Sequence, residues 1–567
     1  MQVDIFPQQR KVTAAGYYLL KNKTAAPIDK QLIIWDELST VKIEMQNAEL
    51  KDFDETFHTG WLHFKPAIKP GESRKMNFTV LRQAHGFVDG ASDNSIVANG
   101  SFINNQTLLP HFGYNSGYEI TNRQERKKRD LPPPQRMAKL EDKSMYRTGV
   151  VGPEADFINF EAIVSTSKEQ FAITPGYIQK DWVENGRHYY HYKMDVPIFN
   201  FFAFLSGKYA VLKENYKGIN IEVYHHPAHN KNVKVMQKAV EHSLDYYGKE
   251  FSPYQYRQVR IIEFPRYASF AQSFSNTIPY SEDIGFIADL RDEDKIDWVS
   301  FVTAHEMGHQ WWGHQVTPAD VQGSAVLSES LAEYSAYMVM EQINGEHQLR
   351  KFLKYEMDRY LRGRRGEVLE EMPLMRAENQ QYIHYPKGGI VMYSLKDRLG
   401  EQKFNQALKN FLHEFHYQSD PYPTTLDLIR HIKAVASAQD MKFIDDVFAK
   451  ITLFDLKTKK ATAKKLTNGN YQVELTIEAD KYYADGKGEE TKDTVDDYFD
   501  IGIFSSDPDK AKDDKHVLFF KKHFIKTGEN ILSFTVKTLP KYAGIDPYIK
   551  MIDRNSNDNM IKVELLQ

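Results

Sequence analysis

The stretch "TAHEMGHQWWGHQ" occupies residues 303–315 and places His305 and His309 four positions apart, with Glu306 directly after the first histidine. On a helix, residues four apart lie on one face, so both imidazoles can reach a single metal ion. The preceding residues, "DKIDWVSFVTA", have apolar side chains at helical spacing, which gives such a helix a face to bury. The stretch therefore predicts a helix with two zinc ligands, on which Glu306 holds the reacting water rather than the metal.

A catalytic zinc ion needs a third protein ligand and one open position. The segment "LSESLAEY" at residues 327–334 offers Glu329 and Glu333 within a second helical pattern. A carboxylate from this segment would complete a site of two histidines and one glutamate. Because both glutamates lie on one face of the helix, spacing alone does not choose between them. The competing interpretation is a helix with two satisfied histidines and another with two solvated glutamates.

The composition limits the possible classes of protein. A chain of 567 residues is too long for one ordinary domain, and a net charge of −4 gives no sign of bulk nucleic-acid binding. The absence of cysteine excludes disulfides, thiolate metal sites and cysteine nucleophiles. No apolar stretch reaches the roughly 18 residues that a membrane span needs, and the first residues, "MQVDIFPQQRKV", lack the apolar core of a signal peptide. We expect a cytosolic protein or a soluble piece of a larger one.

The sequence pattern changes twice along the chain. "KPGESRKMNFTVLR" alternates apolar Met76, Phe78 and Val80 with polar residues, as a strand does. Helical spacing prevails between about residues 230 and 450, and strand patterns return with "TNGNYQVELTIEA", which begins with an Asn-Gly turn. The sequence therefore predicts a β-rich domain at residues 1–212, a mainly helical domain at residues 213–455 and a second β-rich domain at residues 456–567.

The two metal-binding segments together resemble the zinc aminopeptidases of the aminopeptidase N and leukotriene hydrolase type. That family has an aromatic-rich continuation after its histidine motif, like "HQWWG" here, and then a glutamate in a context like "LSESLAEY". The resemblance implies that Glu329 is the third zinc ligand and that Glu333 is a bystander. Residues 310–328 separate His309 from Glu329, one residue more than is usual in the family, and the simplest place for the extra residue is the loop "TPADVQGSA".

A second motif supports the resemblance. "HYPKGGIVMYSL" has Tyr385 in the Y-x-K-G context of the family's catalytic tyrosine, and His384 beside it is taken as incidental. A neutral phenol suits the stabilisation of an oxyanion because it donates a hydrogen bond without adding a charge. The resemblance also implies one Zn²⁺ ion per chain. The implied fold is an N-terminal β-saddle domain, a thermolysin-like, mainly helical peptidase domain and a C-terminal β-sandwich.

One family motif is missing. Aminopeptidases of this family have a Gly-x-Met-Glu-Asn strand before the histidine motif, and its glutamate binds the free amine of the substrate. The equivalent region here is "RYASFAQSFSNTIPYSEDIGF", where Gln272, Ser273 and Phe274 take the place of that strand, and Glu282 aligns with a later family position. We expect these three residues to border the substrate, and we expect the recognition of the amine to be lost or rebuilt.

The missing strand and the stretch "PHFGYN" at residues 110–115 resemble a bacterial subgroup in which such a peptidase domain follows the membrane segments of an ABC-transporter-type permease. The resemblance implies a zinc metallopeptidase, foremost an aminopeptidase with an altered amine-binding strand. The alternatives are a zinc endopeptidase and a low-activity, peptide-binding regulatory domain of a membrane transporter. The expected partner is a peptide, with no nucleic acid and no membrane contact by this chain itself. The cellular location stays open, with a bacterial inner-membrane parent protein as one possibility.

Overall fold

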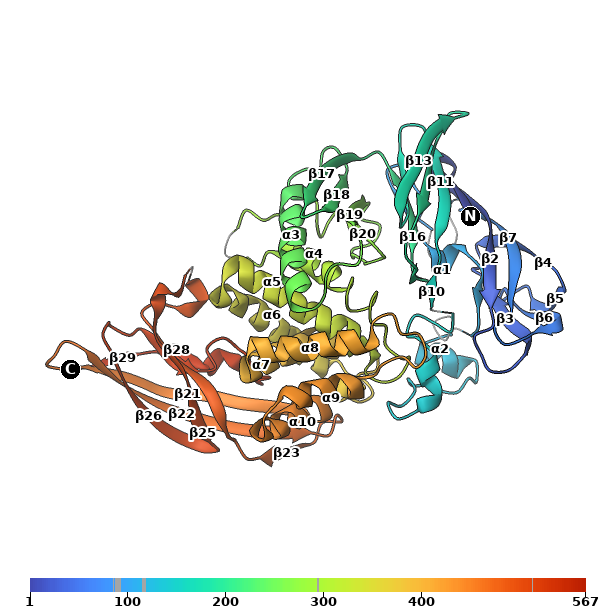
Figure 1. The fold of residues 1–567 in the computed structure, drawn as a ribbon. Coiled ribbons are helices and arrows are strands. Elements are labelled where there is room, and N and C mark those ends of the chain that lie inside the picture. Colours follow the sequence, from blue (N-terminus) through green and yellow to red (C-terminus); the bar gives the residue numbers. More distant parts are fainter. Residues whose placement is uncertain (85, 87–92, 115–118, 155, 293–294, 512) are drawn as a thin grey trace.

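The computed structural model describes residues 1–567 except 85, 87–92, 115–118, 155, 293–294 and 512 (Figure 1). Strands make up most of the N-terminal third, helices dominate the middle, and strands return after α10, which spans Met441–Ala449. Figure 1 shows the helical region between the two β-rich regions. This order confirms the predicted fold class of a multidomain protein with β-rich ends and a helical centre.

The N-terminal region is built on a seven-stranded sheet with the strand order β13-β14-β11-β1-β2-β7-β4. Its strands are β1 (Gln2–Phe6), β2 (Lys11–Lys21), β4 (Ser39–Met45), β7 (Ser73–Gln83), β11 (Glu161–Ser167), β13 (Tyr177–Glu184) and β14 (Arg187–Lys193). A second sheet has the order β5-β6-β3-β9, from β3 (Ile28–Ile34), β5 (Ala48–Asp54), β6 (Thr59–Ile68) and β9 (His111–Phe112). In β7, Met76, Phe78 and Val80 are buried while their neighbours face outward, which confirms the predicted alternation.

A four-stranded sheet opens the central region, with the order β17-β18-β19-β20. The strands are β17 (Ala210–Tyr216), β18 (Ile219–His225), β19 (Gln258–Phe264) and β20 (Thr277–Ser281). The strands β18, β19 and β20 are parallel, and α3 (Val233–Glu250) connects the first two. All residues of β20, and all of β19 except the first, are buried, as suits a parallel sheet that is covered on both faces.

The remaining helices of the central region follow the sheet in the chain. They are α4 (Trp298–Gly308), α5 (Leu331–Asn344), α6 (Glu346–Arg365), α7 (Gly388–Leu399), α8 (Glu401–Phe415), α9 (Thr425–Val435) and α10. Two short π-helical segments precede two of these helices: η4 (Val326–Ser330) leads into α5, and η6 (Ile383–Lys387) leads into α7. Such π-helical turns are rare in proteins, and those that occur often lie at functional sites.

Two more sheets form the C-terminal region. One pairs β22 with β21, β23 and β26, and the other has the order β25-β24-β27-β28. The strands are β21 (Ile451–Lys465), β22 (Tyr471–Ala484), β23 (Glu490–Asp493), β24 (Asp496–Phe504), β25 (Val517–Lys526), β26 (Gly528–Val536), β27 (Tyr542–Ile545), β28 (Met560–Lys562) and β29 (Glu564–Leu566). The predicted Asn-Gly turn joins β21 to β22, and Gly469 has the positive φ of 87° that this turn requires.

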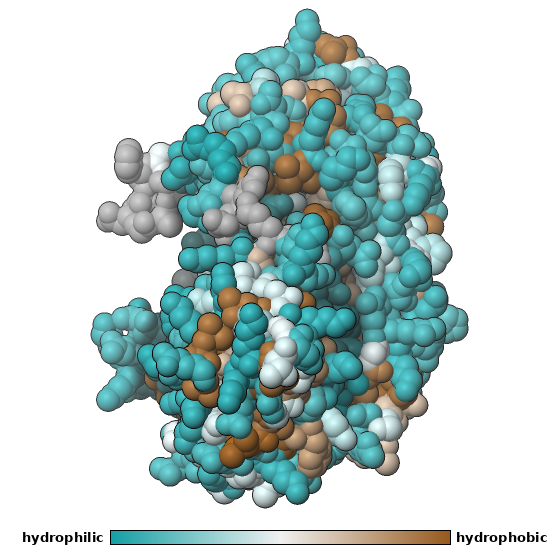
Figure 2. Space-filling model, turned by 90° about the vertical axis from the view of Figure 1, so that its left-hand side faces the viewer, coloured by the Kyte–Doolittle hydropathy of each residue, from teal (hydrophilic) through white to brown (hydrophobic). Residues whose placement is uncertain are grey.

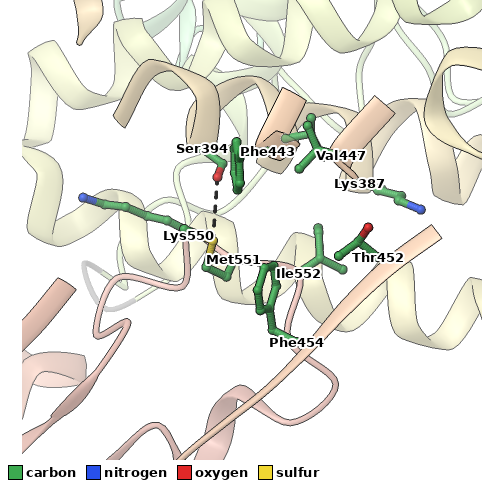
Figure 3. Close-up of a pocket in the computed structure, with 10 residues that line it drawn as sticks. Lys387, Ser394, Phe443, Val447, Thr452, Phe454, Lys550, Met551 and Ile552 are labelled. Carbon is green, nitrogen blue, oxygen red and sulfur yellow. Dashed lines mark hydrogen bonds between the residues drawn. The ribbon is translucent and has the colours of Figure 1, made fainter. Parts of the chain in front are cut away.

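The hydrophobic core of the helical region continues without a break into the C-terminal sheets, whereas much of the N-terminal region has cores of its own. Figure 3 shows part of this seam, where Phe443 and Val447 of α10 meet Phe454 of β21 together with Met551 and Ile552. The predicted domain boundaries at 212/213 and 455/456 stay predictions. Strands β17 and β21 run across these two positions.

Figure 2 shows one face of the molecule, which is mostly hydrophilic and has hydrophobic residues in small groups. Among the helices of the described residues, none combines the length and the apolar character that a membrane crossing requires.

Candidate metal centre

The three predicted metal ligands lie together. His305 is in α4, His309 caps the end of that helix, and Glu329 lies in η4. The two histidine Nε2 atoms are 3.1 Å apart, and Glu329 Oε2 lies 3.3 Å from each of them. Ligand atoms at zinc bond lengths in a tetrahedron are about 3.3 Å apart, so one zinc ion fits among them. Glu329 Oε2 is buried and has no hydrogen-bond partner among the described residues, as expected of a carboxylate oxygen that binds a metal.

Helix α4 is placed by its ends and by a close helix crossing. Asp297 caps its N-terminus by accepting a hydrogen bond of 3.0 Å from the backbone N–H of Ser300. At the other end, Gly308 faces Ala332 of α5, and a Cβ atom at position 308 would lie 3.2 Å from the Cα of Ala332. The glycine therefore lets the helix with the two histidines approach the helix that follows Glu329.

A backbone contact fixes the ring of His309. Its Nδ1 lies 3.0 Å from the carbonyl oxygen of Trp312, which can only accept a hydrogen bond. The proton of the neutral ring therefore sits on Nδ1, and the lone pair of Nε2 points toward Glu329. This is the tautomer that a zinc ligand needs.

Glu306 is buried next to the ligands, and its Oε2 atom has no hydrogen-bond partner among the residues that the structure describes. Burial raises the pKa of Glu306 to about 7, while, to a smaller extent, His309 lowers this pKa and Glu329 raises it. A carboxylate with a pKa near neutrality suits a general base, because it can both accept and return a proton. A bound dication would lower this pKa by its charge.

Tyr385 also lies at the metal ligands. It is part of η6, and its ring centroid is 6.0 Å from that of His305. Burial, and then the charge of Glu329, raises the pKa of Tyr385 well above its usual value, so the hydroxyl stays protonated and can donate a hydrogen bond. The two π-helical segments are joined where Ser330 Oγ donates a hydrogen bond of 2.6 Å to the carbonyl oxygen of His384.

Gln272, Ser273 and Phe274 lie in a short extended segment beside β20, with bridges from Ala271 to Tyr280 and from Phe274 to Thr277. The Ser273 hydroxyl accepts a hydrogen bond of 2.5 Å from Gln310, the residue after His309. The side chain of Phe274 is fully buried, with its ring centroid 4.6 Å from that of Phe201 and 6.1 Å from that of Phe102. The structure thus brings this segment to the end of the histidine motif, but the Phe274 side chain belongs to an apolar core.

The sequence analysis gave no role to Glu333 and His384, yet the structure places both residues at the site. Glu333 Oε1 lies 3.6 Å from Nδ1 of His305, and the ring centroid of His384 is 4.7 Å from that of Tyr385. The position of Glu333, one helical turn after Glu329, could have indicated that it lies near the metal ligands. For His384 the only signal was its place beside Tyr385 in the chain, and burial lowers its pKa to about 4, so it is neutral.

A second group of possible ligands consists of His229, between β18 and α3, Glu263, near the end of β19, and Glu282, directly after β20. Here Nδ1 of His229 lies 2.5 Å from Glu263 Oε1 and 3.8 Å from Glu282 Oε2. The first distance is that of a short hydrogen bond, well below the roughly 3.3 Å between ligands of one zinc ion. This group therefore has the geometry of a partly buried hydrogen-bonded pair.

Two histidines and one glutamate are the ligand set of many zinc sites. Residues 234–449 match the family model described as "Peptidase family M1 domain". The match, together with the group of three ligands, also supports zinc as the cofactor.

Two curated relatives illustrate the similarity. The human protein "Endoplasmic reticulum aminopeptidase 2" is 27% identical over 211 residues, which is 36% of this chain and 22% of that protein. "Leucyl aminopeptidase" of Saccharolobus solfataricus is 23% identical over 271 residues, which is 46% of this chain and 34% of the relative. The chain thus spans about a third or less of the length of these relatives.

Two solved structures have the same fold at low sequence identity. An M1 zinc metallopeptidase from Deinococcus radiodurans has a TM-score of 0.53 at 15% identity, covering 79% of this chain and 92% of the other. Legionella pneumophila aminopeptidase A has a TM-score of 0.58 at 15% identity, covering 100% of this chain and 59% of the other. These likenesses confirm the arrangement of a β-rich N-terminal region, a helical central region and a β-rich C-terminal region.

Proposed function

We propose that this chain is a zinc-dependent metallopeptidase that hydrolyses peptide bonds, foremost as an aminopeptidase with an altered amine-binding strand. The observation that carries the proposal is the group of three ligand atoms separated by 3.1 to 3.3 Å. Its support is the buried Glu306 and the protonated Tyr385 beside that group, together with the family match of residues 234–449.

The proposed roles follow from the chemistry of each side chain. His305, His309 and Glu329 would hold Zn²⁺, which when bound polarises the scissile carbonyl and lowers the pKa of water. Glu306 accepts a proton from the attacking water and later delivers it to the leaving amine. The hydroxyl of Tyr385 donates a hydrogen bond to the carbonyl oxygen as negative charge develops there.

We propose that the peptide lies against residues 272–274. Of the three residues, Gln272 is partly exposed, whereas Ser273 and Phe274 are buried. The contact with a peptide side chain therefore falls to Gln272. Residues 269–276 contain no acidic residue, and this favours a second candidate function, that of an endopeptidase. An ammonium group in a closed site is costly without a carboxylate partner. Residues 269–276 offer no such partner and therefore do not favour a substrate with a free N-terminus.

Matched peptides with a free and an N-acetylated terminus test the end-specificity. We expect one of two outcomes, which the ratio of the two kcat/KM values distinguishes. Either the acetylated peptide is cleaved nearly as well as the free one, or an acidic residue from outside residues 269–276 binds the amine and favours the free terminus. A strict requirement for the free amine, in a complex with no acidic residue near the N-terminus of the substrate, would contradict our interpretation of the missing strand. A zinc-loaded chain that cleaves neither peptide would instead support the regulatory, peptide-binding alternative.

We further propose that the chain is the peptidase domain of a bacterial ABC-transporter-type permease. The support is the absent amine-binding strand and the stretch at residues 110–115, of which residue 115 lies outside the described residues. The test is the mass and the membrane association of the native polypeptide, detected with an antibody against residues 1–567. A native protein with the mass of this chain alone would contradict the proposal.

A further inference from the structure

We propose that Glu333 positions the zinc ligand His305 by accepting a hydrogen bond from its Nδ1 atom. The inference rests on the proposed zinc site and adds a residue to it. The two histidine ligands differ in their support, because Nδ1 of His309 contacts a backbone carbonyl at 3.0 Å. Nδ1 of His305 is buried and has no hydrogen-bond partner among the described residues, and Glu333 Oε1 lies 3.6 Å from it.

Burial makes this contact significant. The side chain of Glu333 is 5% exposed and that of His305 is 9% exposed, so water cannot satisfy either group. Glu333 Oε2 likewise has no partner among the described residues. A buried donor and a buried acceptor that both lack partners destabilise the folded protein, and this cost is removed when they bond to one another.

Metal binding would determine which nitrogen of His305 carries the ring proton. When Nε2 of His305 uses its lone pair toward the metal, the ring proton must be on Nδ1, which faces Glu333. A shift of less than about 1 Å then closes the 3.6 Å separation to a normal hydrogen bond. A carboxylate and a neutral carboxyl group both offer an acceptor oxygen, so the contact forms in either state. Zinc-bound histidines are held in this way by carboxylates or backbone carbonyls in many proteins.

The neighbouring helices confine Glu333 to this position. A Cβ atom on Gly389 of α7 would lie 3.1 Å from the Cβ of Glu333 and 2.8 Å from the hydroxyl of Tyr337, so α7 closes one side. On α6, Glu356 is fully buried and forms an ion pair of 2.9 Å with Arg359. Burial raises the pKa of Glu333, with Glu356 raising it and Arg359 lowering it to a lesser extent. Arg359 is already paired with Glu356, and the hydroxyl of Tyr337 is a second donor beside Glu333. The two oxygens of Glu333 can therefore accept from Tyr337 and from Nδ1 of His305.

Two substitutions of similar size separate the acceptor from the packing. Glu333→Gln keeps an acceptor oxygen, whereas Glu333→Met fills similar space without one. Each zinc-loaded protein is titrated with a chelator, and the zinc dissociation constant is measured. We expect Glu333→Met to weaken zinc binding by about 10- to 100-fold, the range found for partners of metal ligands, and Glu333→Gln to remain close to the unsubstituted chain.

A glutamate on the same helix provides the control. Glu341 accepts hydrogen bonds from Tyr393 and Lys396, away from the ligands, and Glu341→Gln should leave zinc affinity unchanged. Unchanged zinc affinity in Glu333→Met would overturn the proposal, and so would equal losses in the Met and Gln variants. The test does not depend on catalysis. A chain that binds zinc in this Glu333-dependent way but cleaves no peptide would refute the proposed function alone.

Discussion

Glu306 is the buried carboxylate beside the ligands that does not itself take part in the group of three. Replacing it by glutamine removes the proton acceptor and preserves the size of the side chain. We expect Glu306→Gln to abolish peptide cleavage while the chain still holds zinc, as measured by turnover and by metal analysis of the same sample. Loss of zinc together with activity would show that Glu306 helps to hold the metal, and near-normal turnover would exclude it as the general base.

Tyr385 has a matched control in the same stretch of chain. Tyr385→Phe removes only the hydroxyl, and the rate should fall by about 10²- to 10³-fold, the effect of losing one oxyanion donor. KM should change little, since the contact strengthens mainly in the transition state.

The control for this substitution is Tyr382→Phe. The hydroxyl of Tyr382 donates to Glu367 and not to the metal ligands, so kcat should stay close to its normal value. An equal loss of kcat in the two variants would mean that the effect comes from packing of the η6 segment and not from the oxyanion.

Helix packing explains why the ligands lie where they do. The crossing of α4 and α5 depends on Gly308, because an added Cβ atom would be only 3.2 Å from Ala332. Gly308→Ala should therefore destabilise the protein by about 1–3 kcal/mol, as overpacking does, and should also weaken zinc binding by moving the histidines.

Gly248 in α3 makes the matched comparison, since nothing lies within 4 Å of a Cβ atom added there. Gly248→Ala should stabilise the protein by about 0.5–1 kcal/mol through helix propensity. Unfolding in urea, followed by circular dichroism, measures both variants. The same sign of change in both would contradict the close-crossing explanation.

At the scale of the whole molecule, the number of metal ions distinguishes the two groups of possible ligands. We expect one zinc ion per chain by mass spectrometry of metals. His305→Ala should lower that number toward zero, and His229→Ala should leave it at one, because His229 and Glu263 are already at hydrogen-bond distance. Two ions in the unsubstituted chain, reduced to one by His229→Ala, would show that the second group also binds zinc.

The sequence predicted the parts of the molecule that depend on short spacings. The interval between His305 and His309 placed both on one helix face, and the alternation around Phe78 predicted a strand. The sequence could not predict the burial of Phe274, because its neighbours Phe102 and Phe201 are far away in the chain. Nor could helical spacing separate the roles of Glu329 and Glu333, since these depend on which nitrogen of His305 each one faces.

The continuous core between the helical region and the C-terminal sheets has a thermodynamic consequence. Two regions that share buried side chains, as Phe443 and Phe454 do across the seam in Figure 3, melt as one cooperative unit. The N-terminal region also shares a hydrophobic cluster with the central region, around Phe102 and Phe274, whereas the cluster around Trp35 lies entirely within the N-terminal region. Zinc bound at His305 therefore raises the melting temperature of the C-terminal β-rich region as well, although the metal ligands belong to the helical region.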